Sequence, residues 1–134
     1  MHLAATWRQN QADIMKLFFD HAASVVPDID EAVDWYVAAL PGTKVLYKDA
    51  SWAFLDAHGA RLAFVVKSQH PSHLAWRVSQ ADLELLAAQH GKSIDTHRDG
   101  TRGFYLKAPG GNVVEIICMT GTQWEVPGED VTEE

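Results

Sequence analysis

The sequence is poor in cysteine, in basic residues and in long apolar runs. Cys118 is the one cysteine, so no intramolecular disulfide can form, which suits a reducing cytoplasm. Lys and Arg number 11 against 18 Asp and Glu, the formal net charge is −7, and the basic residues are scattered. Nucleic acids and anionic membranes both select basic patches. No apolar stretch reaches membrane-spanning length and no secretory pattern is present at the N-terminus. We therefore expect a cytoplasmic protein without nucleic-acid or membrane partners.

The length and composition predict a single globular domain. A chain of 134 residues with 47% hydrophobic and 22% charged residues can bury a substantial core. Residues 1–16 show no clean periodicity and are predicted to be an N-terminal extension. The folded domain is predicted over residues 17–120. Residues 121–134 are acidic and are predicted to be a tail without fixed structure.

The hydrophobic periodicity predicts an α+β fold in which one pattern, βαβββ, occurs twice. The modules are expected over residues 17–68 and 72–119, joined by a polar linker. Asp28 or Asp30 is expected to cap the first helix, and Gln80 or Asp82 the second, with Gly91 closing it. We predict helices over residues 29–40 and 81–90 and strands over 17–26, 43–48, 52–56, 61–67, 73–79, 92–96, 103–107 and 113–119.

An internal offset supports the duplication. A shift of 52 residues places His21 on His73 and Gly59 on Gly111. The same shift places Ala63 on Glu115. Two equivalent modules related by pseudo-symmetry would face each other across a shared cavity.

Glu115 is the residue that most needs a partner. The turn sequence Pro-Gly-Gly-Asn leads into Val113-Val114-Glu115-Ile116-Ile117, and a carboxylate buried in such a run must be paired or bound to a metal. His21 and His73 open the first strand of each module, and strand alternation allows both to face Glu115. Two imidazoles and one carboxylate on rigid strands suit a divalent transition metal with open positions.

These motifs resemble the vicinal oxygen chelate superfamily, which includes glyoxalase I, methylmalonyl-CoA epimerase, extradiol dioxygenases, fosfomycin-modifying enzymes and bleomycin-resistance proteins. The resemblance covers about residues 17–119 and is carried by Asp20-His21, Asp28, Trp35-Tyr36, the stretch from His73 to Val78 and the stretch from Phe104 to Ile116. It implies two βαβββ modules that form a cupped mixed β-sheet with the helices outside.

The resemblance also implies a metal site and a substrate class. The family's metal ligands match His21, His73 and Glu115, which implies a divalent ion such as Fe, Mn, Zn, Ni or Co. A fourth family ligand falls at Ala63, which cannot coordinate. Tyr105 matches a cavity tyrosine of the fosfomycin-modifying group. The implied partners are a small-molecule substrate and a second copy of the chain, in a homodimer whose metal site lies within one chain or is shared between two.

Three functions stay open from the sequence. The first is a metal-dependent enzyme acting on a small oxygenated metabolite by Lewis-acid stabilisation of an oxyanion, of the lyase/isomerase or epoxide-opening transferase type. The second is an extradiol-type Fe(II) dioxygenase, and the third a non-catalytic protein that sequesters a drug or another small molecule.

Several further residues are candidates for contact with the substrate. Tyr105 is a candidate proton or hydrogen-bond donor, against a core tyrosine with a satisfied hydroxyl. Arg77 and Arg61 are candidates for an anionic substrate group, against side chains that extend to solvent. The residues assigned to the core or to a subunit contact are Trp35, Trp52 and Trp76, and Cys118 is predicted to be a buried structural thiol.

Overall fold

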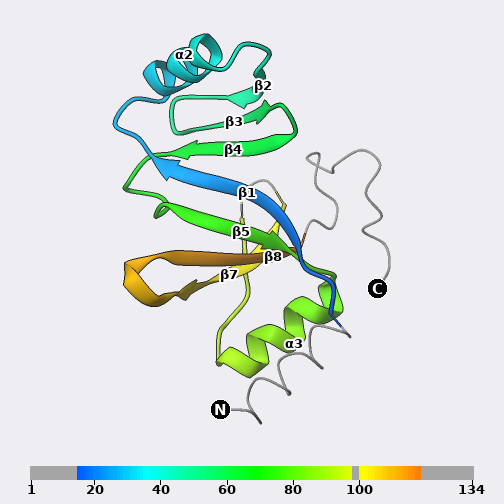
Figure 1. Cartoon of the computed structure of the whole chain (residues 1–134). Coiled ribbons are helices and arrows are strands. Elements are labelled where there is room, and N and C mark those ends of the chain that lie inside the picture. Colours follow the sequence, from blue (N-terminus) through cyan, green and yellow to red (C-terminus); the bar gives the residue numbers. More distant parts are fainter. Residues whose placement is uncertain (1–14, 98–99, 119–134) are drawn as a thin grey trace. The chain divides into compact units, whose positions relative to one another are not determined.

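A computed structural model describes residues 15–97 and 100–118 of the chain (Figure 1). The predicted tail and all but the last two residues of the predicted extension lie outside these ranges. The elements are β1 (Phe18–Val25), α2 (Ile29–Ala39), β2 (Lys44–Lys48), β3 (Trp52–Ala57), β4 (Ala60–Val65), β5 (His73–Arg77), α3 (Gln80–His90), β6 (Asp95–Thr96), β7 (Arg102–Lys107), the short 3₁₀ turn η1 (Pro109–Gly111) and β8 (Val113–Cys118).

The element order confirms the predicted α+β fold with βαβββ occurring twice. Among the described residues the strands form one mixed eight-stranded sheet in the order β2-β3-β4-β1-β5-β8-β7-β6. Counted outward from the centre, the order is β1, β4, β3, β2 on one side and β5, β8, β7, β6 on the other. Each module therefore contributes its strands in the same internal order.

Two compact units can be recognised from the contacts of the chain. The first, called the site unit below, comprises Phe19–Ala75 and Leu106–Glu115. The second, called the α3 unit, comprises Trp76–Tyr105 together with the described residues 15–18 and 116–118.

The core of the site unit lies between α2 and one face of the sheet. Asp28 accepts a hydrogen bond from the backbone N–H of Glu31 and caps α2, as predicted. The helix turns Ile29 and Val33 inward, and both pack in one buried cluster, whose strand members are Ala53, Leu55 and Phe64. Figure 1 shows α2 beside β2, β3 and β4.

Strand register determines which residues share the opposite face. Phe54 pairs with Ala63 across the antiparallel β3–β4 ladder, and Ala63 pairs with Ala23 across the parallel β1–β4 ladder. Because side chains alternate along a strand, this row points away from α2, and His21 has the same parity as Ala23. The face of the sheet opposite to α2 is therefore the face of His21.

In the α3 unit the helix caps differ from the prediction at one end. Ser79, rather than Gln80 or Asp82, caps α3, because its side chain accepts a hydrogen bond from the N–H of Asp82. Gly91 closes the helix in the left-handed region at φ 65°, as predicted. The N–H of Lys92 then donates to the carbonyl of Ala87. This closure occupies the start of the predicted strand 92–96, which shortens it to Asp95–Thr96.

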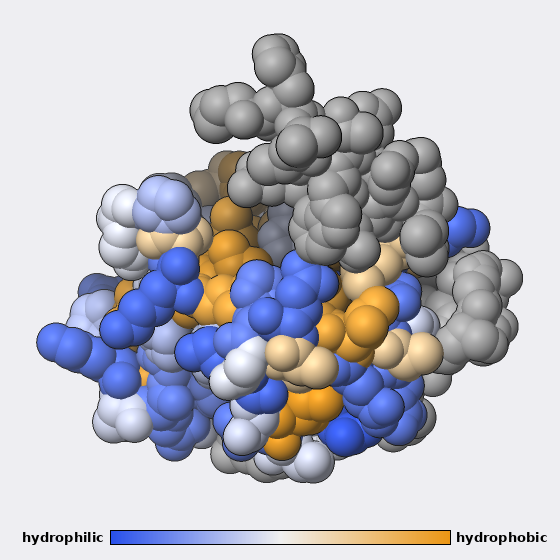
Figure 2. All heavy atoms as spheres, turned by 90° about the horizontal axis from the view of Figure 1, so that it is seen from below, coloured by the Kyte–Doolittle hydropathy of each residue, from blue (hydrophilic) through white to orange (hydrophobic). Residues whose placement is uncertain are grey.

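The surface is mixed in character. On the face seen in Figure 2, hydrophobic patches lie between hydrophilic residues. Trp35 is 62% exposed, so it does not belong to the core, whereas Trp52 and Trp76 are half-buried.

Cys118 is buried, as predicted. Within the described residues, neither helix has the length and apolar character that crossing a membrane requires.

Candidate metal centre

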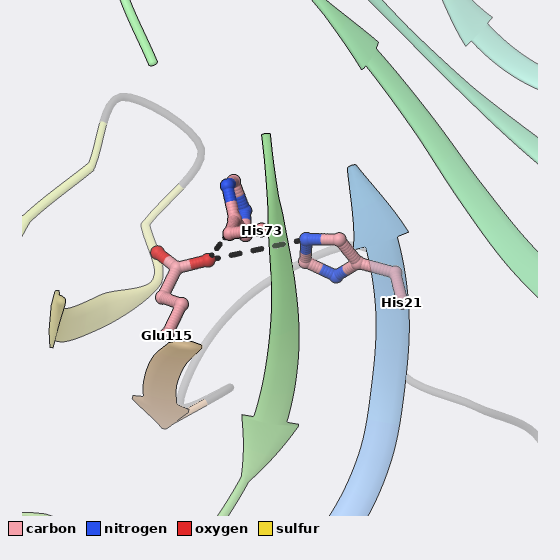
Figure 3. Close-up of side chains that lie close together, drawn as sticks. All are labelled: His21, His73 and Glu115. Atoms are coloured by element: carbon pink, nitrogen blue, oxygen red, sulfur yellow. Dashed lines mark ion pairs between the residues drawn. The ribbon is translucent and has the colours of Figure 1, made fainter. Parts of the chain in front are cut away.

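Three side chains from distant parts of the sequence meet in the site unit. Oε1 of Glu115 lies 3.0 Å from Nε2 of His73 and 3.9 Å from Nε2 of His21 (Figure 3). The two imidazole rings are 5.5 Å apart between centroids. One ligand atom from each residue lies within 4.8 Å of the others. The exposed fraction of these side chains is 14% for His21, 4% for His73 and 5% for Glu115, so the group is largely shielded from water.

The residues that precede His73 hold the start of β5 against β1. The backbone N–H of Val25 donates to Oγ of Ser72 at 2.9 Å. One residue earlier, the carbonyl of Pro71 lies 2.7 Å from Nδ1 of the His73 ring. The segment Pro71-Ser72-His73 therefore fixes both the position of the strand and the orientation of the ring.

Glu115 is placed by the tight turn that precedes β8. Gly110 and Gly111 both adopt positive φ, at 81° and 80°, a conformation that disfavours side chains. The turn is closed by the N–H of Ala108, which donates to the carbonyl of Asn112 at 2.8 Å. The first residues of β8 follow directly, and the strand turns Glu115 inward.

The outer hydrogen bonds of the two histidines determine which nitrogen faces Glu115. A carbonyl oxygen only accepts, so Nδ1 of His73 carries a proton and donates it to Pro71. Nδ1 of His21 lies 2.6 Å from Oδ2 of Asp20, a short, charge-assisted contact. In each neutral ring, Nε2 then holds the lone pair. This arrangement, with an acceptor behind each imidazole, is the one that orients histidines toward metals.

The donor set fits a divalent cation. A neutral Nε2 and a carboxylate oxygen both accept, so their 3.0 Å approach requires a proton or a metal ion between them. Donors at about 2.1 Å from one ion lie roughly 3 to 4 Å from each other, which matches both distances to Glu115. Asp20 adds a second buried carboxylate behind His21. A divalent ion would compensate charges that are otherwise costly to bury.

Comparison of this chain with solved structures identifies proteins that have the same fold. Methylmalonyl-CoA epimerase in complex with methylmalonyl-CoA and NH₄⁺ has a TM-score of 0.58 and 17% identity, over 78% of this chain and 96% of that one. A glyoxalase/bleomycin resistance/dioxygenase superfamily member from Vibrio splendidus 12B01 has a TM-score of 0.54 and 14% identity, over 78% and 97%. The chain has the vicinal oxygen chelate fold.

The same fold occurs as part of longer chains. A variant of homoprotocatechuate 2,3-dioxygenase from Brevibacterium fuscum has a TM-score of 0.54 and 21% identity, over 75% of this chain and 32% of the dioxygenase chain. No family model matches the sequence. No curated protein matches it either. The likeness to the vicinal oxygen chelate proteins therefore concerns the fold, and activity has to be argued from the site.

Of the other predicted site residues, Arg77 and Tyr105 lie in the α3 unit, whereas Arg61 and Ala63 lie in the site unit. Arg77 is buried at the end of β5, with its guanidinium carbon 5.3 Å from the centre of the Phe18 ring. Tyr105 is half-buried on β7, with its ring 6.4 Å from that of His97. Their roles in catalysis stay predictions. Ala63 is buried in the site unit and adds no fourth ligand, as expected.

Two features of the site were not assigned a role from the sequence. Asp20 contacts Nδ1 of His21 through its carboxylate. The adjacency of Asp20 and His21 in the sequence is the feature from which this contact could have been predicted. Phe54 contacts the His21 ring edge-on, with centroids 5.7 Å apart. The alternation of Trp52, Ala53 and Phe54 indicates that the two aromatic residues share a face, but only the register with β4 identifies that face as the one carrying His21.

Proposed function

We propose that this protein is a metal-dependent enzyme of the vicinal oxygen chelate type, acting on a small oxygenated metabolite. The observation that carries the proposal is the buried group of His21, His73 and Glu115 with both Nε2 atoms turned toward one carboxylate oxygen. Three protein donors leave open positions at a divalent ion for water and substrate oxygens. When bound, the ion would act as a Lewis acid that polarises such an oxygen.

The residues around the triad keep it in a form that can bind a cation. Asp20 holds the proton of His21 on Nδ1, and Pro71 does the same for His73, so neither ring turns its protonated nitrogen inward. Phe54 packs edge-on against His21 and limits rotation of that ring. Burial of Glu115 keeps water from competing for its oxygens.

The reaction types that we propose are lyase or isomerase chemistry and epoxide opening. Each develops negative charge on a substrate oxygen, which a cation at the triad would stabilise. Ring cleavage with Fe(II) and O₂ is the alternative that uses the same ligand set.

Metal content is the direct test. The protein, purified without a histidine tag, is expected to contain close to one equivalent of a divalent transition metal by elemental analysis. His73→Ala removes a buried donor and should abolish stoichiometric metal. His90→Ala changes an exposed histidine at the end of α3 and should leave the metal content unchanged. Wild-type protein that stays metal-free after incubation with Mn, Fe, Co, Ni and Zn salts would overturn the proposal.

A non-catalytic binding protein is the rival function. The observation that favours it is the row of aromatic side chains next to His21, which suits an apolar ligand. The two functions differ in their response to metal removal. Turnover that disappears with EDTA and returns with metal supports the enzyme, whereas tight ligand binding that EDTA leaves unchanged, without turnover, supports the binding protein.

A further inference from the structure

Three aromatic side chains form a row on the face of the sheet that carries His21. The rings of Tyr47 and Trp52 are 4.9 Å apart, and those of Trp52 and Phe54 are 6.0 Å apart. Phe54 continues the row to His21. Tyr47 pairs with Phe54 across the β2–β3 ladder, so the three residues share one face. We call Tyr47, Trp52 and Phe54 the aromatic row.

One carboxylate holds the outer end of the row. Oδ2 of Asp49 accepts a hydrogen bond from the hydroxyl of Tyr47 at 2.6 Å. Oδ1 accepts from the N–H groups of Ser51 and Trp52 at 2.8 and 2.9 Å. The hydrogen bond from Tyr47, helped by those from the turn and opposed by partial burial, holds the pKa of Asp49 well below its usual value. The row is therefore ordered before any ligand arrives.

A cation lies beside the row. The guanidinium carbon of Arg61, on β4, is 5.5 Å from the centre of the Phe54 ring. Arg61 has the same parity as Ala63, so it belongs to the face of the aromatic row and of His21. Phe54 thus contacts Arg61 and one of the three donors of the triad.

The inner and outer members of the aromatic row differ in burial. Phe54 is buried, whereas Tyr47, Trp52 and Arg61 are half-buried. The cluster packed against α2 lies on the opposite face of the sheet. Aromatic side chains with a few polar or charged groups among them are typical of sites that bind small ligands.

We propose that the substrate carries a flat aromatic or conjugated group and a negative charge. The aromatic row receives the flat group, and Arg61 pairs with the anionic group by charge-assisted hydrogen bonds. This inference rests on the proposed function in that it assigns the substrate class of the same site. The oxygen to be polarised then lies on the side of the ligand nearest His21.

The test uses metal-free protein, so that its result does not depend on metal binding. The probes are 2-naphthoate, its uncharged amide 2-naphthamide, and the non-aromatic cyclohexanecarboxylate, each titrated by isothermal calorimetry into EDTA-treated protein. We expect 2-naphthoate to bind most tightly, because it alone combines both features. Trp52→Leu should weaken its binding about threefold to tenfold.

Arg61→Gln separates charge from stacking. Loss of the guanidinium charge should weaken the binding of 2-naphthoate about tenfold while leaving the binding of 2-naphthamide unchanged. Trp35→Leu makes the same exchange as Trp52→Leu at an exposed helix position and should change nothing. The proposal is overturned if 2-naphthoate does not bind, or if its affinity is the same in the wild type and in Arg61→Gln. A protein that binds 2-naphthoate in this way but takes up no metal would contradict the proposed enzyme and not the ligand class.

Discussion

The two faces of the β2–β3–β4–β1 sheet in the site unit are built from different chemistry. The face toward α2 carries aliphatic residues and Phe64, packed into a buried cluster. The other face carries His21, the aromatic row and Arg61, with several side chains only half-buried. Because neighbouring residues on one strand alternate between these faces, a single segment such as β3 supplies both. Stability and ligand chemistry are therefore separable residue by residue.

The largest expected effect is on the α2 face. Leu55 is fully buried in the cluster, so Leu55→Ala should lower the free energy of unfolding by about 2–5 kcal/mol. Urea denaturation measures this loss, and metal affinity of the folded fraction should stay unchanged. Leu46→Ala, at an exposed position on β2, is the matched control and should cost far less. Equal losses for the two variants would contradict the division between the faces.

The next effect is expected beside the triad. Asp20→Asn keeps the shape of the side chain but removes the charge behind His21, so metal affinity should fall about tenfold to a hundredfold. Competition with a chromogenic chelator measures the affinity. Asp34→Asn, on the exposed side of α2, is the control for a lost negative charge. Unchanged affinity in Asp20→Asn would show that the carboxylate does not support the ligand.

The smallest effect is expected at the outer end of the aromatic row. The pKa of Asp49 is lowered in the folded protein, so its contribution to stability is present above its ordinary pKa of about 4 and declines as the pH falls below that value. Asp49→Asn should lower stability by about 1 kcal/mol at pH 7. The difference between variant and wild type should shrink at pH 3. A difference that is independent of pH, measured by urea denaturation at both values, would exclude the carboxylate charge as its cause.

Much of the fold follows from patterns within short segments. The hydrophobic periodicity that predicted a helix over residues 29–40 places Ile29 and Val33 on one side, which is the buried side of α2, and the Pro-Gly-Gly-Asn turn predicted the start of β8. The convergence of His21, His73 and Glu115 was predicted from parity and from the family resemblance together, and the structure brings these residues within contact. Their function as metal ligands stays a prediction.

Other features depend on contacts that a linear pattern does not contain. Ser79 caps α3 in place of its polar neighbours because of the local backbone path. Trp35 was assigned to the core or to a subunit contact, yet it lies off the side of the helix that carries Ile29 and Val33 and is exposed. The hydrogen bond from His73 goes to the backbone carbonyl of Pro71. Because every residue has such a carbonyl, the type of residue 71 gives no sign of this bond in the sequence.

That last contact has a consequence for how the site can change in evolution. The acceptor behind His21 is the side chain of residue 20, so a single substitution there can change the hydrogen bond to this histidine. The acceptor behind His73 is a peptide carbonyl, which every amino acid at position 71 would retain. Under the proposed function, natural variation in the preferred metal ion is therefore expected to accompany changes at position 20, the residue before His21, and not changes at position 71.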